Sequence, residues 1–138
     1  MVVKAGAAIV AGCTAVIKPS EETPLIALAF AKLAANAGIA DGVFNVVQGL
    51  GNEAGAALVA HPGISRISFT GSVPTAKLVA RAAADNLTPC SLELGGKDPA
   101  IVLPGANLDR AVPGILWGAT ANSGQSCLSI ERVYVHES

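Results

Sequence analysis

Residues 66–96 read RISFTGSVPTAKLVARAAADNLTPCSLELGG, and this stretch decides the fold class. Its opening β-rich run stops at Gly71-Ser72, a helical segment follows over 74–84, and the apolar strand Leu92–Leu94 is broken by two glycines. A strand, a crossover helix and a second strand in this order predict a parallel βαβ unit.

The preceding residues repeat this alternation. We expect strands at Cys13–Ile17 and Val43–Val47, and a short helix over 52–60. Thr23-Pro24 is a good helix start and Gly38 a plausible stop, which predicts a longer helix between them. Four strands joined by three helices predict an α/β fold with a Rossmann-like, doubly wound parallel sheet.

The sequence changes character after the two glycines. We expect a short strand at 100–103, a helix that begins at Asn107 or Asp109, and a final alternating strand at 132–136. Nothing follows that last strand to pair with it or cover it, so the second unit looks incomplete. We therefore place a domain boundary near Gly95.

Composition narrows the function classes. The 138 residues include 9 Lys+Arg and 10 Asp+Glu, with 51% apolar and 14% charged residues, which excludes a disordered chain. A net charge of −1 provides no electrostatic attraction to nucleic acid or to an anionic membrane. The longest charge-free run, 111–130, contains Pro113 and several polar residues and makes a poor membrane span. The 15 glycines and many alanines predict closely packed backbones.

Cysteine usage predicts a reducing compartment, the cytoplasm. Three cysteines without a CxxC pair favour free thiols. Val10-Ala-Gly-Cys13 resembles a lipoprotein cleavage site, but a buried strand at Cys13–Ile17 is the favoured interpretation. Both histidines lie far from any cysteine in sequence, so we expect no metal site.

Two turns could hold a dinucleotide. Gly49-Leu-Gly51-Asn-Glu-Ala54 matches G-x-G-x-x-A between a strand and a helix. No acidic residue occurs at 70–75, where the fingerprint needs one, so a simple tight turn is equally consistent. Phe69-Thr-Gly-Ser72 is a second strand-to-helix turn whose backbone amides and hydroxyls could bind a phosphate.

Two side chains suit covalent chemistry. Cys127 lies in the polar, glycine-containing segment that begins at Asn122, and such a segment can expose and stabilise a thiolate. Glu93 lies between Leu92 and Leu94, where burial would raise the pKa of its carboxyl toward that of a general base. The alternatives are a buried structural cysteine and an edge-strand acid that faces water.

Four motifs together resemble the aldehyde dehydrogenase superfamily. Lys18-Pro-Ser-Glu21, Phe69-Thr-Gly-Ser72, Leu92-Glu-Leu-Gly-Gly-Lys97 and Gly124-Gln-Ser-Cys127 occur in that family's order, and the spacing from Glu93 to Cys127 agrees. The resemblance runs through the whole chain. It implies that residues 1–95 are part of a cofactor domain and that 96–138 open an α/β catalytic domain.

The resemblance also implies a reaction. Cys127, as thiolate, would attack an aldehyde and form a thiohemiacetal, hydride would pass to a nicotinamide, and a thioester would remain. Glu93 would activate the water that releases the carboxylic acid. The backbone N–H of Cys127 would contribute to the oxyanion hole.

The cofactor implied is NAD, with NADP as the alternative. Lys18 and Glu21 look like the pair that holds the adenosine ribose hydroxyls, and the Glu21 carboxylate favours NAD because it repels a 2′-phosphate. Ser72 would contact the pyrophosphate. The full set of cofactor residues that the resemblance implies is Lys18, Ser20, Glu21, Gly51, Gly55, Gly71, Ser72 and Leu94.

The sequence also departs from the family pattern. The side-chain oxyanion asparagine would precede Met1, Ala76 replaces a glycine, and Ser129 is unusual after the cysteine. We therefore expect an internal fragment that is inactive by itself, taken from a protein that forms a dimer or tetramer. The alternative function is a non-catalytic dinucleotide-binding module.

Overall fold

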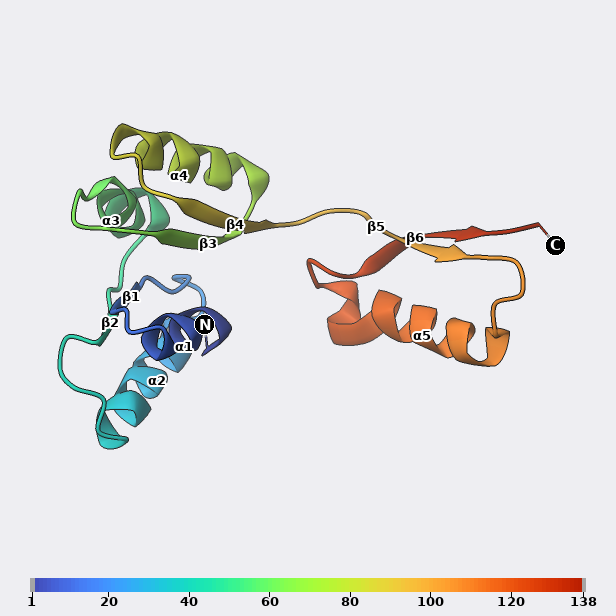
Figure 1. The fold of residues 1–138 in the computed structure, drawn as a ribbon, viewed down its shortest axis with the longest axis horizontal. Coiled ribbons are helices and arrows are strands. Elements are labelled where there is room, and N and C mark those ends of the chain that lie inside the picture. Colours follow the sequence, from blue (N-terminus) through green and yellow to red (C-terminus); the bar gives the residue numbers. More distant parts are fainter. Residues whose placement is uncertain (1, 138) are drawn as a thin grey trace. The chain divides into compact units, whose positions relative to one another are not determined.

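The computed structural model describes residues 2–137, in which helices and short strands alternate except that two strands follow one another between residues 90 and 102 (Figure 1). The elements in chain order are α1 (Val2–Val10), β1 (Ala15–Ile17), α2 (Pro24–Asn36), β2 (Phe44–Val46), a π-helical turn (Gly51–Gly55) that continues into α3 (Ala56–Ala60), β3 (Ile67–Gly71), α4 (Val73–Asp85), β4 (Cys90–Leu94), β5 (Asp98–Val102), α5 (Leu108–Thr120), a 3-10 turn (Ala121–Gly124) and β6 (Ile130–Val135).

The strands pair two by two. β1 lies parallel to β2, with Ala15 opposite Phe44, and β5 lies parallel to β6, with Val102 opposite Val135. β3 is paired with β4 in a third two-stranded sheet. The predicted α/β class is confirmed, and within residues 2–137 the strands form these separate pairs instead of one continuous sheet.

Backbone contacts divide the chain into two compact units. The first unit comprises residues up to 68 together with 78–91, and the second comprises 69–77 together with the residues from 92 onward. Both β3 and β4 therefore contribute residues to each unit. The domain boundary near Gly95 remains a prediction.

The N-terminal residues form a helix that the sequence analysis did not predict. α1 is closed by a glycine turn: Gly12 has a φ of 82°, and its amide donates to the carbonyl of Ile9. The amide of Cys13 donates to the carbonyl of Ala8 at 2.9 Å, so Cys13 completes this helix end and β1 starts only at Ala15. The prediction of a buried strand over Cys13–Ile17 is wrong: the strand starts at Ala15, its three residues are half-buried or exposed, and the thiol of Cys13 is exposed.

α2 begins and ends where the sequence predicts. Pro24 occupies its first turn, although the Thr23 side chain makes no capping hydrogen bond. Gly38 has a φ of 84°, and the amide of Ile39 beyond it donates to the carbonyl of Ala34. This closed glycine end turns the chain back toward β2.

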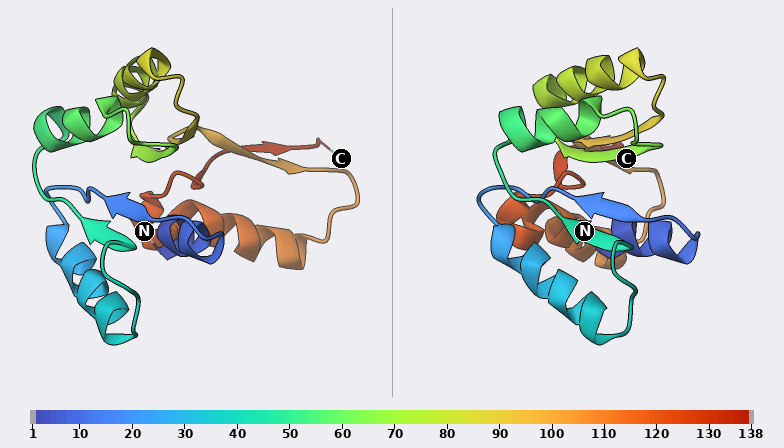
Figure 2. Two further views of the ribbon diagram at one scale, coloured as in Figure 1. Left: turned by 60° about the vertical axis from the view of Figure 1, so that its left-hand side comes forward. Right: turned by 90° about the vertical axis from the view of Figure 1, so that its left-hand side faces the viewer.

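α5 covers one face of the β5–β6 pair, as both the first view and the rotated views show (Figures 1 and 2). The side chain of Asn107 accepts a hydrogen bond from the amide of Arg110, so Asn107 and not Asp109 caps the helix. An apolar groove of about 240 Å³ lies along this packing, lined by Val102, Leu108, Ala111, Val112, Ile115, Leu116, Val133 and Val135.

Small side chains make most of the core. Among the described residues, the buried apolar side chains are Ala5, Ala27, Ala34, Ile67, Ala76, Val79, Ala83 and Val102. Alanine predominates in this set, while the close packing of backbones expected from the composition remains a prediction. Among residues 2–137, no helix combines the length and the apolar character needed to cross a membrane.

Candidate functional site

A polar cluster forms where the parallel strands β1 and β2 end. Lys18 follows β1 directly, and its ammonium donates to the carbonyl of Gly49, three residues after β2, at 3.0 Å. The same ammonium donates to the carbonyl of Pro19 at 2.7 Å and to the Glu21 carboxylate at 3.3 Å. Ligands of parallel α/β sheets bind at this carboxyl edge. The structure thus brings together two of the predicted cofactor residues, Lys18 and Glu21.

The charges of this cluster favour ionised Glu21. The pKa of its carboxyl is lowered by a backbone hydrogen bond at Glu21, and further by the hydrogen bond and positive charge of Lys18. The Lys18 side chain is 15% exposed, whereas that of Glu21 is 47% exposed. Ser20 accepts a hydrogen bond from the amide of Glu22 at 3.3 Å, which shapes the turn between the two charges. The carboxylate therefore faces solvent beside a mostly covered ammonium.

Glycines let the backbone approach this cluster. A Cβ on Gly55 would lie 3.3 Å from Cδ of Lys18, so the lysine stem packs against the glycine. Gly49 has a φ of 140°, and a Cβ there would lie 2.8 Å from Cβ of Ala54. The space around Gly51 is open. The sequence analysis did not include Gly49 among the site residues, although its place in the G-x-G turn was the available signal.

The second predicted turn belongs to the other unit. Gly71 ends β3, and Ser72 precedes α4, where its hydroxyl accepts from the amide of Thr75 at 3.3 Å and lies 3.0 Å from the Thr75 hydroxyl. Ser72 therefore caps α4 and is exposed. Its position at a helix start agrees with the sequence prediction, while phosphate binding remains a prediction.

β4 carries the predicted base. Glu93 is exposed on β4, and Leu94, its last residue, is half-buried. The expectation of a buried carboxylate is therefore wrong for the described chain: the side chain faces solvent, as the edge-strand alternative requires. Its role as a general base remains a prediction, because no described contact involves its carboxylate.

Cys127 occupies a tight exposed turn after α5. The amide of Ser129 donates to the carbonyl of Ser126 at 3.1 Å, and the Ser126 hydroxyl accepts from the amide of Leu128 at 3.2 Å. Cys127 is exposed, and no described residue accepts a hydrogen bond from its amide. The turn thus presents both a thiol and a backbone donor to solvent.

The backbone that leads to this turn is strained. Asn122, Ser123 and Gly124 have φ values of 53°, 59° and 73°, and left-handed conformations are unfavourable for the first two. The Asn122 side chain donates to the carbonyl of Gln125 at 2.9 Å, which holds the run closed. Such strain clusters at functional sites, and no sequence signal other than Gly124 indicated it.

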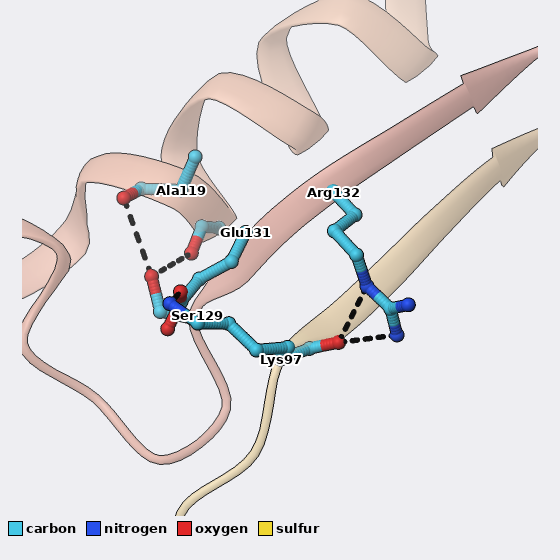
Figure 3. Close-up of polar contacts among 6 residues, drawn as sticks. Lys97, Ala119, Ser129, Glu131 and Arg132 are labelled. Atoms are coloured by element: carbon cyan, nitrogen blue, oxygen red, sulfur yellow. Dashed lines mark hydrogen bonds and ion pairs between the residues drawn. The ribbon is translucent and has the colours of Figure 1, made fainter.

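Glu131 and Arg132 of β6, which the sequence analysis did not single out, bind Lys97, the residue directly before β5. The guanidinium of Arg132 donates twice to the carbonyl of Lys97, at 2.9 and 2.6 Å, and the ammonium of Lys97 pairs with Glu131 (Figure 3). The segment between Glu93 and β5 is thereby joined to the strand that follows the Cys127 turn. Within the described residues, no group of three or more His, Cys, Asp or Glu side chains could hold a metal ion.

Comparison with known proteins assigns this chain to one family. The sequence model of the aldehyde dehydrogenase family matches residues 1–138. Aldehyde dehydrogenase 1 of Tanacetum cinerariifolium is 47% identical over 97% of this chain, which corresponds to 27% of that protein. The chain therefore spans about a quarter of the length of this relative.

Solved structures agree with the sequence match. A mutant of aldehyde dehydrogenase C from Pseudomonas syringae, solved with NAD⁺ and octanal, superposes with a TM-score of 0.90 at 49% identity and covers 96% of this chain and 27% of that one. An NADP-dependent enzyme from E. coli gives 0.92 at 45% identity and covers 97% and 28%. From its sequence, its strand pairing and these likenesses, the chain belongs to the aldehyde dehydrogenase family.

Proposed function

We propose that the protein oxidises an aldehyde to a carboxylic acid with a nicotinamide dinucleotide, and that Cys127 is the nucleophile. The observation that carries this proposal is the exposed Cys127 turn in a chain of the aldehyde dehydrogenase family. A thiolate suits the reaction because it adds to a carbonyl and later leaves from a thioester.

The proposed reaction has two covalent stages. The Cys127 sulfur bonds to the aldehyde carbon, and the backbone N–H of Cys127 stabilises the oxygen that becomes negative. The bound dinucleotide supplies a hydride acceptor, so loss of hydride from that carbon leaves a thioester on sulfur. Glu93 removes a proton from water, the water oxygen attacks the thioester, and the carbon–sulfur bond breaks to release the acid and the thiolate.

The residues at the ends of β1 and β2 fit a dinucleotide. The Lys18 ammonium, a donor, lies 3.3 Å from the Glu21 carboxylate, an acceptor. A donor and an acceptor side by side suit two adjacent ribose hydroxyls. The ionised Glu21 carboxylate opposes a 2′-phosphate, so we propose NAD as the cofactor, with NADP as the alternative. Ser20, Gly51 and Gly55 complete this part of the proposed site.

Three further residues of the second unit are assigned to the rest of the cofactor. Ser72, at the start of α4, is assigned to the pyrophosphate, with Gly71 and Leu94 beside the cofactor path. Residues 1–95 then form the cofactor part and 96–138 the catalytic part of the proposed arrangement. The substrate is an aldehyde, in keeping with the octanal bound to the Pseudomonas relative. A homo-oligomeric state and a cytoplasmic location remain predictions.

Two measurements test the proposal. In the complete product of the gene that encodes this chain, Cys127→Ala should abolish aldehyde-dependent NADH formation, whereas Cys90→Ala, at a half-buried thiol, should leave most of it. Calorimetric titration of both variants with NAD⁺ should give equal affinities. Binding with no oxidation in the parent protein would instead support the alternative, a non-catalytic dinucleotide-binding module.

A further inference from the structure

The hydroxyl of Ser129 is buried beneath the Cys127 turn. Ser129 is 3% exposed and is the only buried polar residue among those described. Its Oγ lies 3.3 Å from the carbonyl oxygen of Ala119 and 3.5 Å from that of Gly118, so its single hydrogen is shared between them (Figure 3). Both carbonyls belong to the last turn of α5, where helical carbonyls lack intrahelical partners.

Two further contacts seat the same segment on the end of α5. A Cβ on Gly118 would lie 2.6 Å from Cδ1 of Ile130, so the Ile130 side chain packs directly on the helix backbone. A Cβ on Gly124 would lie 3.0 Å from the carbonyl oxygen of Ala119 and 3.9 Å from Oγ of Ser129. The chain therefore leaves α5, makes its left-handed run, and returns to the same helix end.

We propose that Ser129 is a positioning residue for Cys127: its buried hydroxyl fastens the turn to α5 so that the thiol and the Cys127 amide keep a fixed relation. This inference rests on the proposed function, which makes Cys127 the nucleophile and its amide the oxyanion donor. Loss of the hydroxyl leaves two helix-end carbonyls without this partner and releases the turn.

The role predicts a selective chemical effect. Acetyl transfer from p-nitrophenyl acetate forms a bond from the Cys127 sulfur to the acetyl carbon and expels p-nitrophenolate, and it develops an oxyanion. Alkylation by iodoacetamide displaces iodide and develops none. A loosened turn should therefore slow acetylation much more than alkylation.

The test uses the intact chain, with peptide mass spectrometry to separate the reactions of the three cysteines. In the parent chain, the ratio of acetylation to alkylation rates should be higher at Cys127 than at the exposed Cys13. Ser129→Ala should lower the ratio of acetylation to alkylation at Cys127 about tenfold. This fall is smaller than the ~10²–10³-fold loss of rate that follows complete removal of one oxyanion donor. Ser129→Thr, which keeps a hydroxyl, should restore most of the ratio.

Two other variants complete the test. Ser91→Ala removes a half-buried hydroxyl that accepts from Arg66 in the first unit, and it should leave the Cys127 ratio unchanged. Gly124→Ala adds a Cβ against the Ala119 carbonyl and should lower the ratio as Ser129→Ala does, which provides a second reading if Ser129→Ala does not fold.

The outcomes separate the two proposals. A parent ratio at Cys127 no higher than at Cys13 would contradict the amide's role in the proposed function, and the positioning role with it. A raised parent ratio that Ser129→Ala or Gly124→Ala leaves unchanged would overturn the positioning role alone. A fall in both rates by the same factor would also overturn it, because it would indicate a general loss of structure.

Discussion

The ammonium of Lys18 donates a hydrogen bond to the carbonyl oxygen of Gly49 at 3.0 Å, and this bond joins the ends of two parallel strands. Lys18 also contacts Glu21, so one cation connects the turn after β1 with the segment after β2 in the first unit. The affinity for a dinucleotide and the local stability should therefore depend on the same side chain.

Replacement of Lys18 should weaken dinucleotide binding. Lys18→Met keeps much of the apolar stem but removes the charged donor, and hydrogen bonds to charged groups contribute about 1.5–3 kcal/mol. In calorimetric titration, we expect the affinity for NAD⁺ to fall at least about tenfold. Lys32→Met, at an exposed lysine of α2, is the matched control, and an equal effect in both variants would remove Lys18 from the proposed site.

The lowered pKa of Glu21 should give stability a small acid dependence. Ionised Glu21 favours folding, so its contribution is complete above the ordinary glutamate pKa of about 4.3 and is lost as the pH falls through the lowered value. The melting temperature of the parent should exceed that of Glu21→Gln by about 1 °C at neutral pH, because exposed ion pairs contribute little. The difference should shrink as the pH falls below the ordinary glutamate pKa of about 4.3 and through the lowered pKa of Glu21.

The control for this pH dependence is a double-mutant cycle. In a Lys18→Met background the acid-dependent difference caused by Glu21→Gln should shrink, because the ion pair is already absent. An undiminished difference would show that Lys18 does not lower the pKa of Glu21.

Gly49 should tolerate no side chain. Gly49→Ala forces a Cβ to within 2.8 Å of Cβ of Ala54 and places alanine at a φ of 140°, so we expect a loss of about 2 kcal/mol in the free energy of unfolding. Gly51→Ala has open space and should change it by less than about 0.5 kcal/mol. Urea denaturation measures both, and similar values for the two variants would contradict this account of the turn.

Two glycines of α5 should respond in opposite directions. Gly114→Ala meets nothing within 4 Å and should stabilise the chain by about 0.5–1 kcal/mol through helix propensity. Gly118→Ala gains the same propensity but pushes on Ile130, and overpacking costs about 1–3 kcal/mol. Urea midpoints should therefore order Gly114→Ala above the parent and the parent above Gly118→Ala; a stabilised Gly118→Ala would show that Ile130 moves aside freely.

The elements that the sequence predicted are those with strong local signals. Pro24 and Gly38 bracket α2, and Asn107 caps α5, because these residues act on the backbone within a few positions. The pairing of Lys18 with Glu21 was expected from the family resemblance, and it forms locally because the two residues are three positions apart after β1.

What the sequence did not predict depends on contacts or weak local signals. α1 has no acidic residue in its first turn, so nothing marked its start. The exposure of Glu93 depends on what packs beside β4, which an apolar run alone does not determine. Ser129 looks like any loop serine until α5 brings the Ala119 carbonyl against it.

The return of the Cys127 segment to the end of α5 has a kinetic consequence. The contacts that Ser129, Gly124 and Ile130 make with the end of α5 lie between Gly118 and Ile130, and segments of such length close in roughly 10–100 ns. The contacts that Ser129 and Ile130 make with the end of α5 therefore form early, and they shape the turn of Cys127, the proposed nucleophile, ahead of the slower pairing of β6 with β5. Substitutions far from this stretch should reach Cys127 only by disturbing α5 or β6.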